Sequence, residues 1–423
     1  MFHPTAEPSN PVVWDLPDPT DIPREPTAEQ ARIQAHIEDR MDLHRAFLRN
    51  LGFYNWMTKA SKKDFFVDAD KSRAGLRALP VVNFLDIGNK AYADAIVRRL
   101  SPKTVAASAN ISAVAPLDLE LSLLYGSGTG RMAGTAVVLA MEAKCGKILC
   151  SAPTNVACDK FAAHIDKRTR DITMDCNKDK EKNDRTRFRH KFVVRAYNPR
   201  HEVAAFESLL QRPHHEVASA KLDEEYGWKL HLSLAFWLLA LVGSPAVRRL
   251  RLDDSDALWA LRRSINDDVD FERLQGVATG ILTWAQYSAR PVAQSVLESY
   301  MEKILECTDI LCTTPAATHN FKPLRLWKNN LAKGVAIDDA ATMNRADLYC
   351  VWGNTLLPCF LFGEQLPPTV ITAGEQDADG NFVNRFARSS HISALLFFRQ
   401  LVFQYTACHL AGSPQSLSDV APG

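Results

Sequence analysis

Short apolar runs separated by polar stretches recur along the chain from about residue 100. Each run has about the length of a buried strand, and most are bounded by turn residues. The runs are LSLLY (121–125), KILCSA (147–152), FVVRAY (192–197), DILCTT (309–314), GVAID (334–338) and PCFLF (358–362). Strands that alternate with helical stretches predict an α/β fold, in which a parallel sheet is covered by helices on both faces.

The segment between residues 198 and 306 lacks such runs. It consists of helical stretches rich in Leu, Ala and Trp, which predict a helical insertion into the sheet domain. Its most apolar part, LSLAFWLLALVG (232–243), is shorter than the roughly 20 residues that a membrane-spanning helix needs. We therefore expect a buried helix there and no membrane association.

The N-terminal region differs from the rest in composition. Residues 1–26 contain seven prolines and few large apolar side chains, which predicts a disordered, extended arm. Thr27 and Gln30 have the spacing of a capping box, and apolar residues then follow near one face of a helix over 27–51. Packing of this helix on the chain itself is the favoured interpretation, and binding of a protein partner is the alternative.

These patterns predict a division of the chain into six parts. They are a Pro-rich arm (1–26), a helical N-terminal extension (27–99), the first part of the sheet domain (100–197), the helical insertion (198–306), the second part of the sheet domain (307–410) and a disordered polar tail (411–423). The length of 423 residues fits two or three structural units.

Charge and cysteine content narrow the classes of function. The 50 Lys and Arg residues nearly balance the 49 Asp and Glu residues, so the chain is not a polycation and any nucleic-acid contact must come from a local patch. The nine cysteines form no CxxC pair or zinc-type cluster, and no signal peptide is apparent. We therefore expect reduced thiols and an intracellular location, either cytoplasmic or nuclear.

One densely charged segment, residues 167–191, has an excess of Lys and Arg. A solvated loop is the favoured interpretation. The alternative is a patch that contacts phosphates beside a nucleic-acid groove, because Lys and Arg neutralise backbone charge without recognising sequence.

A glycine-rich turn, YGSGTGRM (125–132), joins a predicted strand to a predicted helix over 132–143. Such a turn exposes backbone N–H groups at a helix N-terminus, which suits a polyphosphate. Compared with the P-loop pattern GxxxxGK[ST], Tyr125 replaces the first glycine, Arg131 the lysine and Met132 the hydroxyl residue. The turn is therefore only a weak indication of nucleotide binding on its own.

Two adjacent carboxylates, Asp338 and Asp339, follow the predicted strand GVAID. In a nucleotide hydrolase the first would support Mg²⁺ and the second would orient or deprotonate the attacking water. A simple turn or helix N-cap is the alternative, and it is favoured when the pair is considered in isolation.

The order of four segments resembles superfamily 1 DNA/RNA helicases, in the branch of RNA-surveillance and tRNA-splicing-linked helicases. The segments are the glycine-rich turn, SAPTNVACDKFAAHI (151–165), ILCTTPAAT (310–318) and AIDDAATMNRADLYCVWGNTLLPCFLFGEQLPP (336–368). The resemblance covers roughly residues 120–390. It implies the N-terminal RecA-like domain of a P-loop NTPase that binds ATP, Mg²⁺ and the backbone of single-stranded RNA or DNA.

The resemblance also implies roles for three groups of residues. The nucleotide-binding positions are Gly126, Gly128, Thr129, Gly130, Arg131 and Met132. The catalytic positions are Asp338, which would also hold Mg²⁺, Asp339 at the place of the family's catalytic Glu, and Gln365, which would sense the γ-phosphate. The positions that would contact the single strand are Pro153, Thr154, Asn155, Thr313 and Thr314.

Departures from the family pattern predict impaired catalysis. Arg131 is bulkier than the usual lysine, Met132 offers a thioether to a cation that prefers oxygen, and Asp339 is one methylene shorter than Glu. Because only a short tail follows Leu401, we also expect no second RecA-like domain. The predicted function is thus a nucleic-acid-dependent ATPase with impaired turnover, and the alternatives are a non-catalytic binding module or a truncated gene product.

Overall fold

A computed structural model describes residues 89–98, 122–125, 129–213, 228–352, 357–363, 393–394 and 407–409. The predicted Pro-rich arm, the helix over 27–51 and the C-terminal tail lie outside these residues, and so do Gly126, Gly128 and Gln365.

The described strands form one seven-stranded sheet in which every pair is parallel. The strands are β1 (Ser122–Tyr125), β2 (Ile148–Ser151), β3 (Val193–Arg195), β4 (Ile310–Cys312), β5 (Gly334–Ile337), β6 (Cys359–Gly363) and β7 (Ala407–His409), and their spatial order is β3-β4-β2-β5-β6-β1-β7. Each of the six apolar runs contains one strand. The prediction of an α/β fold with a parallel sheet is confirmed.

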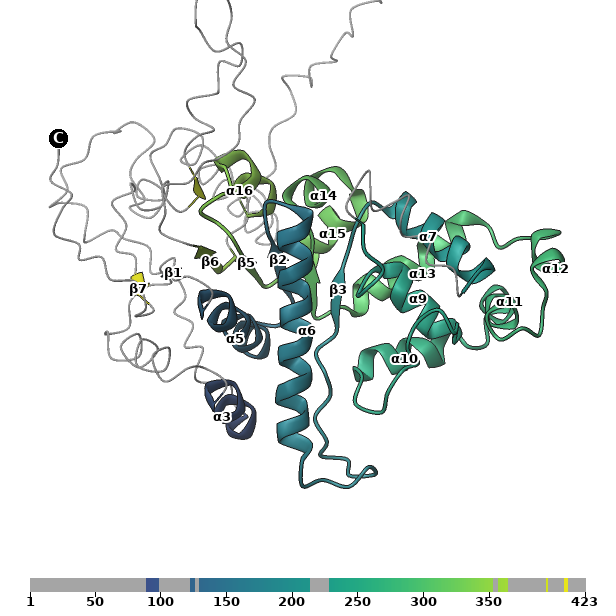
Figure 1. Ribbon diagram of the computed structural model, residues 1–423, viewed down its shortest axis with the longest axis horizontal. Helices are drawn as coiled ribbons and strands as arrows, with labels where there is room; N and C mark the ends of the chain where they lie inside the picture. Colours follow the sequence, from purple (N-terminus) through teal and green to yellow (C-terminus); the bar gives the residue numbers. More distant parts are fainter. Residues whose placement is uncertain are drawn as a thin grey trace, which may run out of the picture.

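Helices connect the strands (Figure 1). The helices before β3 are α3 (Lys90–Arg98), α5 (Thr129–Cys145) and α6 (Asn155–Asn177). Those between β3 and β4 are α7 (Pro199–Gln211), α9 (Leu234–Val242), α10 (Asp256–Ile265), α11 (Val269–Ala278), α12 (Trp284–Ser288) and α13 (Gln294–Cys307). Those after β4 are α14 (Pro315–Asn320), α15 (Lys322–Asn330) and α16 (Arg345–Val351).

The path of the chain places helices on opposite faces of the sheet. From β1 the chain crosses to β2 and then to the edge strand β3, and it returns through β4, β5 and β6. Because parallel crossovers are right-handed, the outward and the returning connections lie on opposite faces. Figure 1 shows α5 and α6 side by side in front of the sheet. In open sheets of this kind, ligands bind beyond the carboxyl ends of the strands, where the connections diverge.

Close packing of α5 on the sheet requires a glycine. A Cβ at Gly134 would lie 2.8 Å from Cδ1 of Phe362 on β6, which is closer than real Cβ contacts. The pattern of apolar residues did not identify this position, because a missing side chain leaves no hydrophobic signal.

The helix α9 confirms the predicted buried helix in the most apolar segment. All nine of its residues are buried, its N-terminus is capped by Ser233, and it ends at Gly243 with a φ of 80°. Trp237 on α9 donates from Nε1 to the carbonyl of Val193 at 3.1 Å, which joins the helical segment to β3. No helix in the described ranges is long and apolar enough to span a membrane.

Candidate functional site

Hydrogen bonds beyond the strand ends hold the carboxyl edge of the sheet together. The backbone N–H of Asp338 donates to the carbonyl of Ser151 at 2.9 Å, which links the end of β5 to that of β2. Ser151 Oγ donates to the carbonyl of Thr313 at 2.7 Å, and the N–H of Ala340 donates to the carbonyl of Phe362 at 2.7 Å. The ends of β4, β2, β5 and β6 therefore form one continuous, ordered edge.

The two carboxylates of the predicted acidic pair occupy different environments. Asp338 is buried and follows β5 directly. Asp339 is half-buried and has a φ of 55°, a left-handed conformation that Asp tolerates better than most residues. The carbonyl of Asp339 accepts a hydrogen bond from the N–H of Thr342 at 3.0 Å. The backbone after β5 thus forms a turn, which is the alternative that we gave for the acidic pair. The turn itself assigns no role to the two carboxylates.

The helix after the glycine-rich turn starts earlier than the sequence pattern suggested. We expected helix from residue 132, whereas α5 begins at Thr129. Thr129, Gly130, Arg131 and Met132 therefore belong to the first helical turn, whose N–H groups have no acceptors within the helix. These N–H groups and the positive end of the helix dipole make the start of α5 suitable for a phosphate.

The start of α5 and the acidic end of β5 lie at the same edge of one sheet. The strand β6 separates β1 from β5, with Tyr125 in register with Gly363 and Ile337 in register with Leu361. Neighbouring strands are about 4.8 Å apart, so β1 and β5 are separated by roughly 10 Å. The sheet therefore brings together two groups that are more than 200 residues apart in sequence.

At the start of α6, the predicted strand-contacting residues have defined partners. Oγ1 of Thr154, which is exposed, caps the helix by accepting from the N–H of Ala157 at 3.1 Å. Oδ1 of Asn155 accepts from Nη2 of Arg195 at 2.8 Å, and the same arginine donates from Nε to Asp159 at 2.7 Å. Arg195 therefore fixes the orientation of Asn155.

Arg195 belongs to this site, although no chemical role was predicted for it. Only 1% of its side chain is exposed, at the end of β3. Its guanidinium also lies over the ring of Tyr197, 3.9 Å from the ring centroid, and the Tyr197 hydroxyl donates to Asp159 at 2.7 Å. An arginine within the apolar run FVVRAY was the signal that could have identified it, because a buried charge requires partners.

Of the two threonines after β4, one has a structural role for its hydroxyl group. Thr314 caps α14, with Oγ1 accepting from the N–H of Ala317 at 3.4 Å. Thr313 is fully buried, and its Oγ1 has no hydrogen-bond partner among the described residues. Pro153, the remaining predicted contact, is half-buried between β2 and α6.

Cysteine chemistry at this edge is suppressed by burial. The thiol of Cys158 on α6 has its pKa raised to about 12, chiefly by burial and also by the nearby charges of Asp159 and Asp338. Burial likewise raises the pKa of Cys312 well above its ordinary value. Both thiols are therefore protonated at neutral pH and are not activated nucleophiles.

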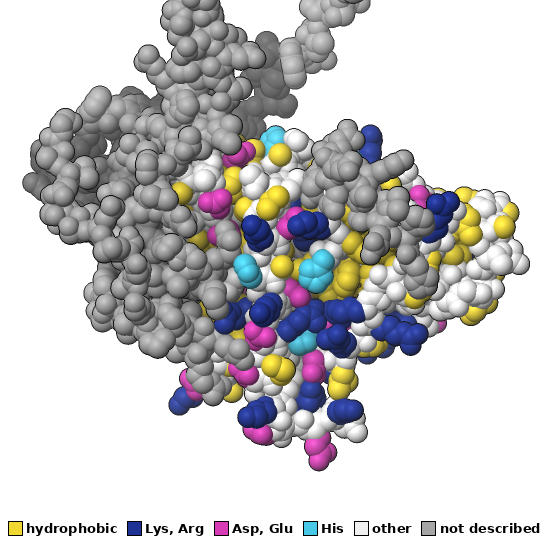
Figure 2. Space-filling view, in the orientation of Figure 1, with side chains coloured by type: hydrophobic (Ala, Val, Ile, Leu, Met, Phe, Trp, Pro, Cys, Tyr) yellow, Lys and Arg dark blue, Asp and Glu magenta, His cyan; other side chains and the backbone are white. Residues whose placement is uncertain are grey.

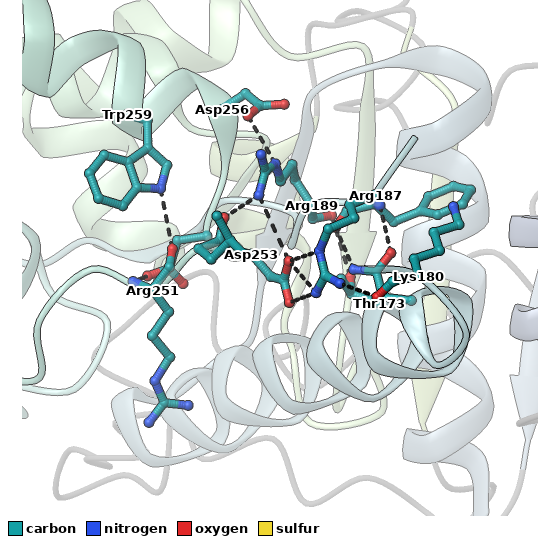
Figure 3. Close-up of polar contacts among 12 residues, drawn as sticks. Thr173, Lys180, Arg187, Arg189, Arg251, Asp253, Asp256 and Trp259 are labelled. Carbon is teal, nitrogen blue, oxygen red and sulfur yellow. Dashed lines mark hydrogen bonds and ion pairs between the residues drawn. The ribbon is translucent and has the colours of Figure 1, made fainter. Parts of the chain in front are cut away.

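The densely charged segment 167–191 is largely engaged within the chain. Figure 3 shows Arg187 facing Asp253, with Nη2 within 2.7 Å of Oδ2 and Nε within 3.0 Å of Oδ1. Arg189 pairs with Asp256, Nε to Oδ1, at 3.0 Å. These arginines attach the loop after α6 to the helical segment between β3 and β4, so their charges serve the fold.

Comparison with models of protein families found no match, and comparison with curated proteins found none either. Within the described residues, no group of three or more His, Cys, Asp or Glu side chains is arranged to hold a metal ion. The functional inference therefore depends on the geometry of the carboxyl edge.

Proposed function

We propose that this chain contains a P-loop nucleotide-binding domain of the superfamily 1 helicase type, which binds ATP and single-stranded nucleic acid and hydrolyses ATP slowly. The observation that carries the proposal is the position of the α5 start and of Asp338 at one carboxyl edge, with only β6 between their strands. A triphosphate with its metal ion needs these two features together, an array of N–H donors and a carboxylate.

The residues present fit phosphate better than they fit the metal ion. The first turn of α5 supplies backbone donors whatever its side chains are. Asp338 supplies the kind of oxygen ligand that Mg²⁺ prefers, whereas Met132 stands at the position where the resemblance implies a hydroxyl. Mg²⁺, when bound, would neutralise charge on the phosphates. We therefore expect nucleotide binding that depends weakly on Mg²⁺.

Turnover is expected to be low because of Asp339. Its side chain is one methylene shorter than that of Glu. Its backbone is left-handed and belongs to a turn, so the carboxylate projects from a turn. Positioning of a general base contributes about 10²–10⁴-fold to a rate, so a displaced carboxylate forfeits part of that factor. A non-catalytic binding module is the second candidate, and Arg131 and Met132 favour it.

Nucleic-acid binding is proposed for the start of α6 at the same edge. Asn155 is oriented by Arg195 and Thr154 is exposed beside it. Polar groups held in fixed positions by buried partners can contact a sugar-phosphate backbone with little loss of side-chain entropy.

ATP hydrolysis with and without single-stranded RNA or DNA tests the proposal. Turnover above background that disappears in Asp338→Ala supports the ATPase, and nucleotide binding without turnover supports the non-catalytic module. Asp267→Ala, which removes an exposed carboxylate that follows α10, is the matched control. Absence of nucleotide binding by the unmodified chain would refute both.

A further inference from the structure

Cationic side chains gather along the boundary between α6 and the segment that leads into and out of α9. Figure 2 shows Lys and Arg side chains concentrated across the middle of this face. We call this surface the basic seam. Its members are Lys160, Lys167 and Arg170 on α6, with Lys229, His231 and Arg248 from the facing segment.

The two sides of the basic seam are in contact. Lys229 Nζ lies 3.9 Å from Oδ2 of Asp159 on α6. Arg170 on α6 lies 3.9 Å from Asp254, which also pairs with Arg248 at 2.8 Å. His231 lies within electrostatic reach of both Arg170 and Arg248. Lys229, Arg170, Arg248 and His231 therefore belong to one surface, and Lys160 and Lys167 directly follow two of its carboxylates, Asp159 and Asp166, on α6.

Three carboxylates that border the basic seam are paired with arginines. Asp159 is paired with the buried Arg195, Asp166 with Arg170 at 2.8 Å, and Asp254 with Arg248. In contrast, Lys160 and Lys167 are exposed, and no carboxylate of the described part of the chain lies within ion-pair distance of either. The surface thus keeps a positive excess although the whole chain is nearly neutral.

The spacing of the lysines suits a repeating anion. Lys160 and Lys167 are seven residues apart on α6, so they lie on the same face about 10 Å apart. Lys229 lies beside the first turns of α6, with its Nζ 3.9 Å from Oδ2 of Asp159. Lysines are point charges on flexible stems, and a row of them neutralises successive phosphates without recognising bases.

We propose that the basic seam is a sequence-independent track for the phosphate backbone of single-stranded nucleic acid, which continues from Thr154 and Asn155 along the exposed face of α6. The choice of nucleic acid as the polyanion rests on the proposed function, since Thr154 and Asn155 lie where α6 begins. The charge of the surface is independent of that choice.

Fluorescence anisotropy with a labelled oligouridine of about 20 nucleotides, on the full chain and across a series of salt concentrations, tests the track. The variant Lys160→Glu/Lys167→Glu should bind about tenfold more weakly or worse. The magnitude of its slope of log affinity against log salt should fall by about 1.4, since each phosphate contact contributes about 0.7. The control Lys322→Glu/Lys333→Glu reverses two exposed lysines outside the seam and should bind as the unmodified chain does.

Three results would overturn the track: equal binding by the seam variant, no binding of the oligouridine by the unmodified chain, or equal displacement of the RNA by poly-glutamate of the same charge. Binding of a fluorescent ATP analogue separates this inference from the proposed function. The seam variant should keep that binding. Arg131→Glu, which reverses the charge at the start of α5, should weaken it while leaving RNA binding in place.

Discussion

Arg195 donates from Nε to Oδ1 of Asp159 at 2.7 Å, and both side chains are almost completely removed from solvent. A buried ion pair is costly to form and costlier to break, because one partner alone is a charge without compensation. This pair joins β3 to the first turns of α6, and the same guanidinium holds Asn155. The orientation of a proposed nucleic-acid contact therefore depends on a residue in the sheet.

Replacing Arg195 with Met should lower the free energy of unfolding by about 3–5 kcal/mol, because Asp159 then loses its buried cation and keeps only the exposed Lys229, 3.9 Å away. Urea denaturation measures the change. The double variant Arg195→Met/Asp159→Leu should recover part of the loss, since no charge remains buried. Lys167→Ala, an exposed change on the same helix, should alter stability by less than about 0.5 kcal/mol. Equal stability of Arg195→Met and the unmodified chain would contradict the assigned role.

Replacing Gly134 with Ala should destabilise the fold by about 1–3 kcal/mol, because the added Cβ would overlap the ring of Phe362. The second substitution Phe362→Leu should make Gly134→Ala less costly, and thermal unfolding of the four chains in this cycle measures the coupling. Strict additivity of the two changes would show that α5 and β6 do not approach each other as described.

The stability of the protein should depend on pH through Glu202 on α7. This side chain is fully buried and accepts from the N–H groups of Tyr197 and Ala235, at 3.2 and 3.0 Å. Burial is the main cause that raises its pKa from 4.5 to about 7. Between these values the unfolded chain has released the proton while the folded chain retains it, so folding becomes less favourable as pH rises, by up to about 3 kcal/mol.

The variant Glu202→Gln isolates that effect, because it removes the titration and keeps the size of the side chain. The unfolding free energy of the unmodified chain minus that of the variant should fall by up to about 3 kcal/mol as pH rises from about 4.5 to 7, and it should be constant above that range. Urea denaturation at a series of pH values measures it. A difference that does not vary with pH would rule out the raised pKa.

Removing the guanidinium of Arg187 should loosen the loop after α6. Arg187→Ala loses a two-pronged pair with Asp253 and should lower the free energy of unfolding. Limited proteolysis should cleave the loop faster in this variant. The nearby Arg185→Ala removes an exposed arginine and is the matched control. Equal cleavage rates in the two variants would contradict the structural role of the pair.

Strand positions could be predicted from sequence because a buried parallel strand is a short continuous apolar run, and GVAID and KILCSA have that form. The start of α5 was misplaced because Gly130 suggested a loop, whereas the helix already includes it. The contact between Asn155 and Arg195 could not be predicted, since it depends on which strands are neighbours. The pairing of Arg187 with Asp253 was equally hidden, because it joins residues 66 positions apart.

Titration of the chain with a fluorescent ATP analogue, with Mg²⁺ and with chelator, tests the central inference most directly. We predict saturable binding that ATP and pyrophosphate displace, and that changes little on removal of Mg²⁺. The variant Arg131→Lys/Met132→Thr restores the amine and hydroxyl of the P-loop pattern and should bind about tenfold more tightly in the presence of Mg²⁺ only. Two results would show that the start of α5 and Asp338 do not form a nucleotide site. One is absence of binding by the unmodified chain, and the other is equal affinity of the variant and the unmodified chain for the ATP analogue in the presence of Mg²⁺.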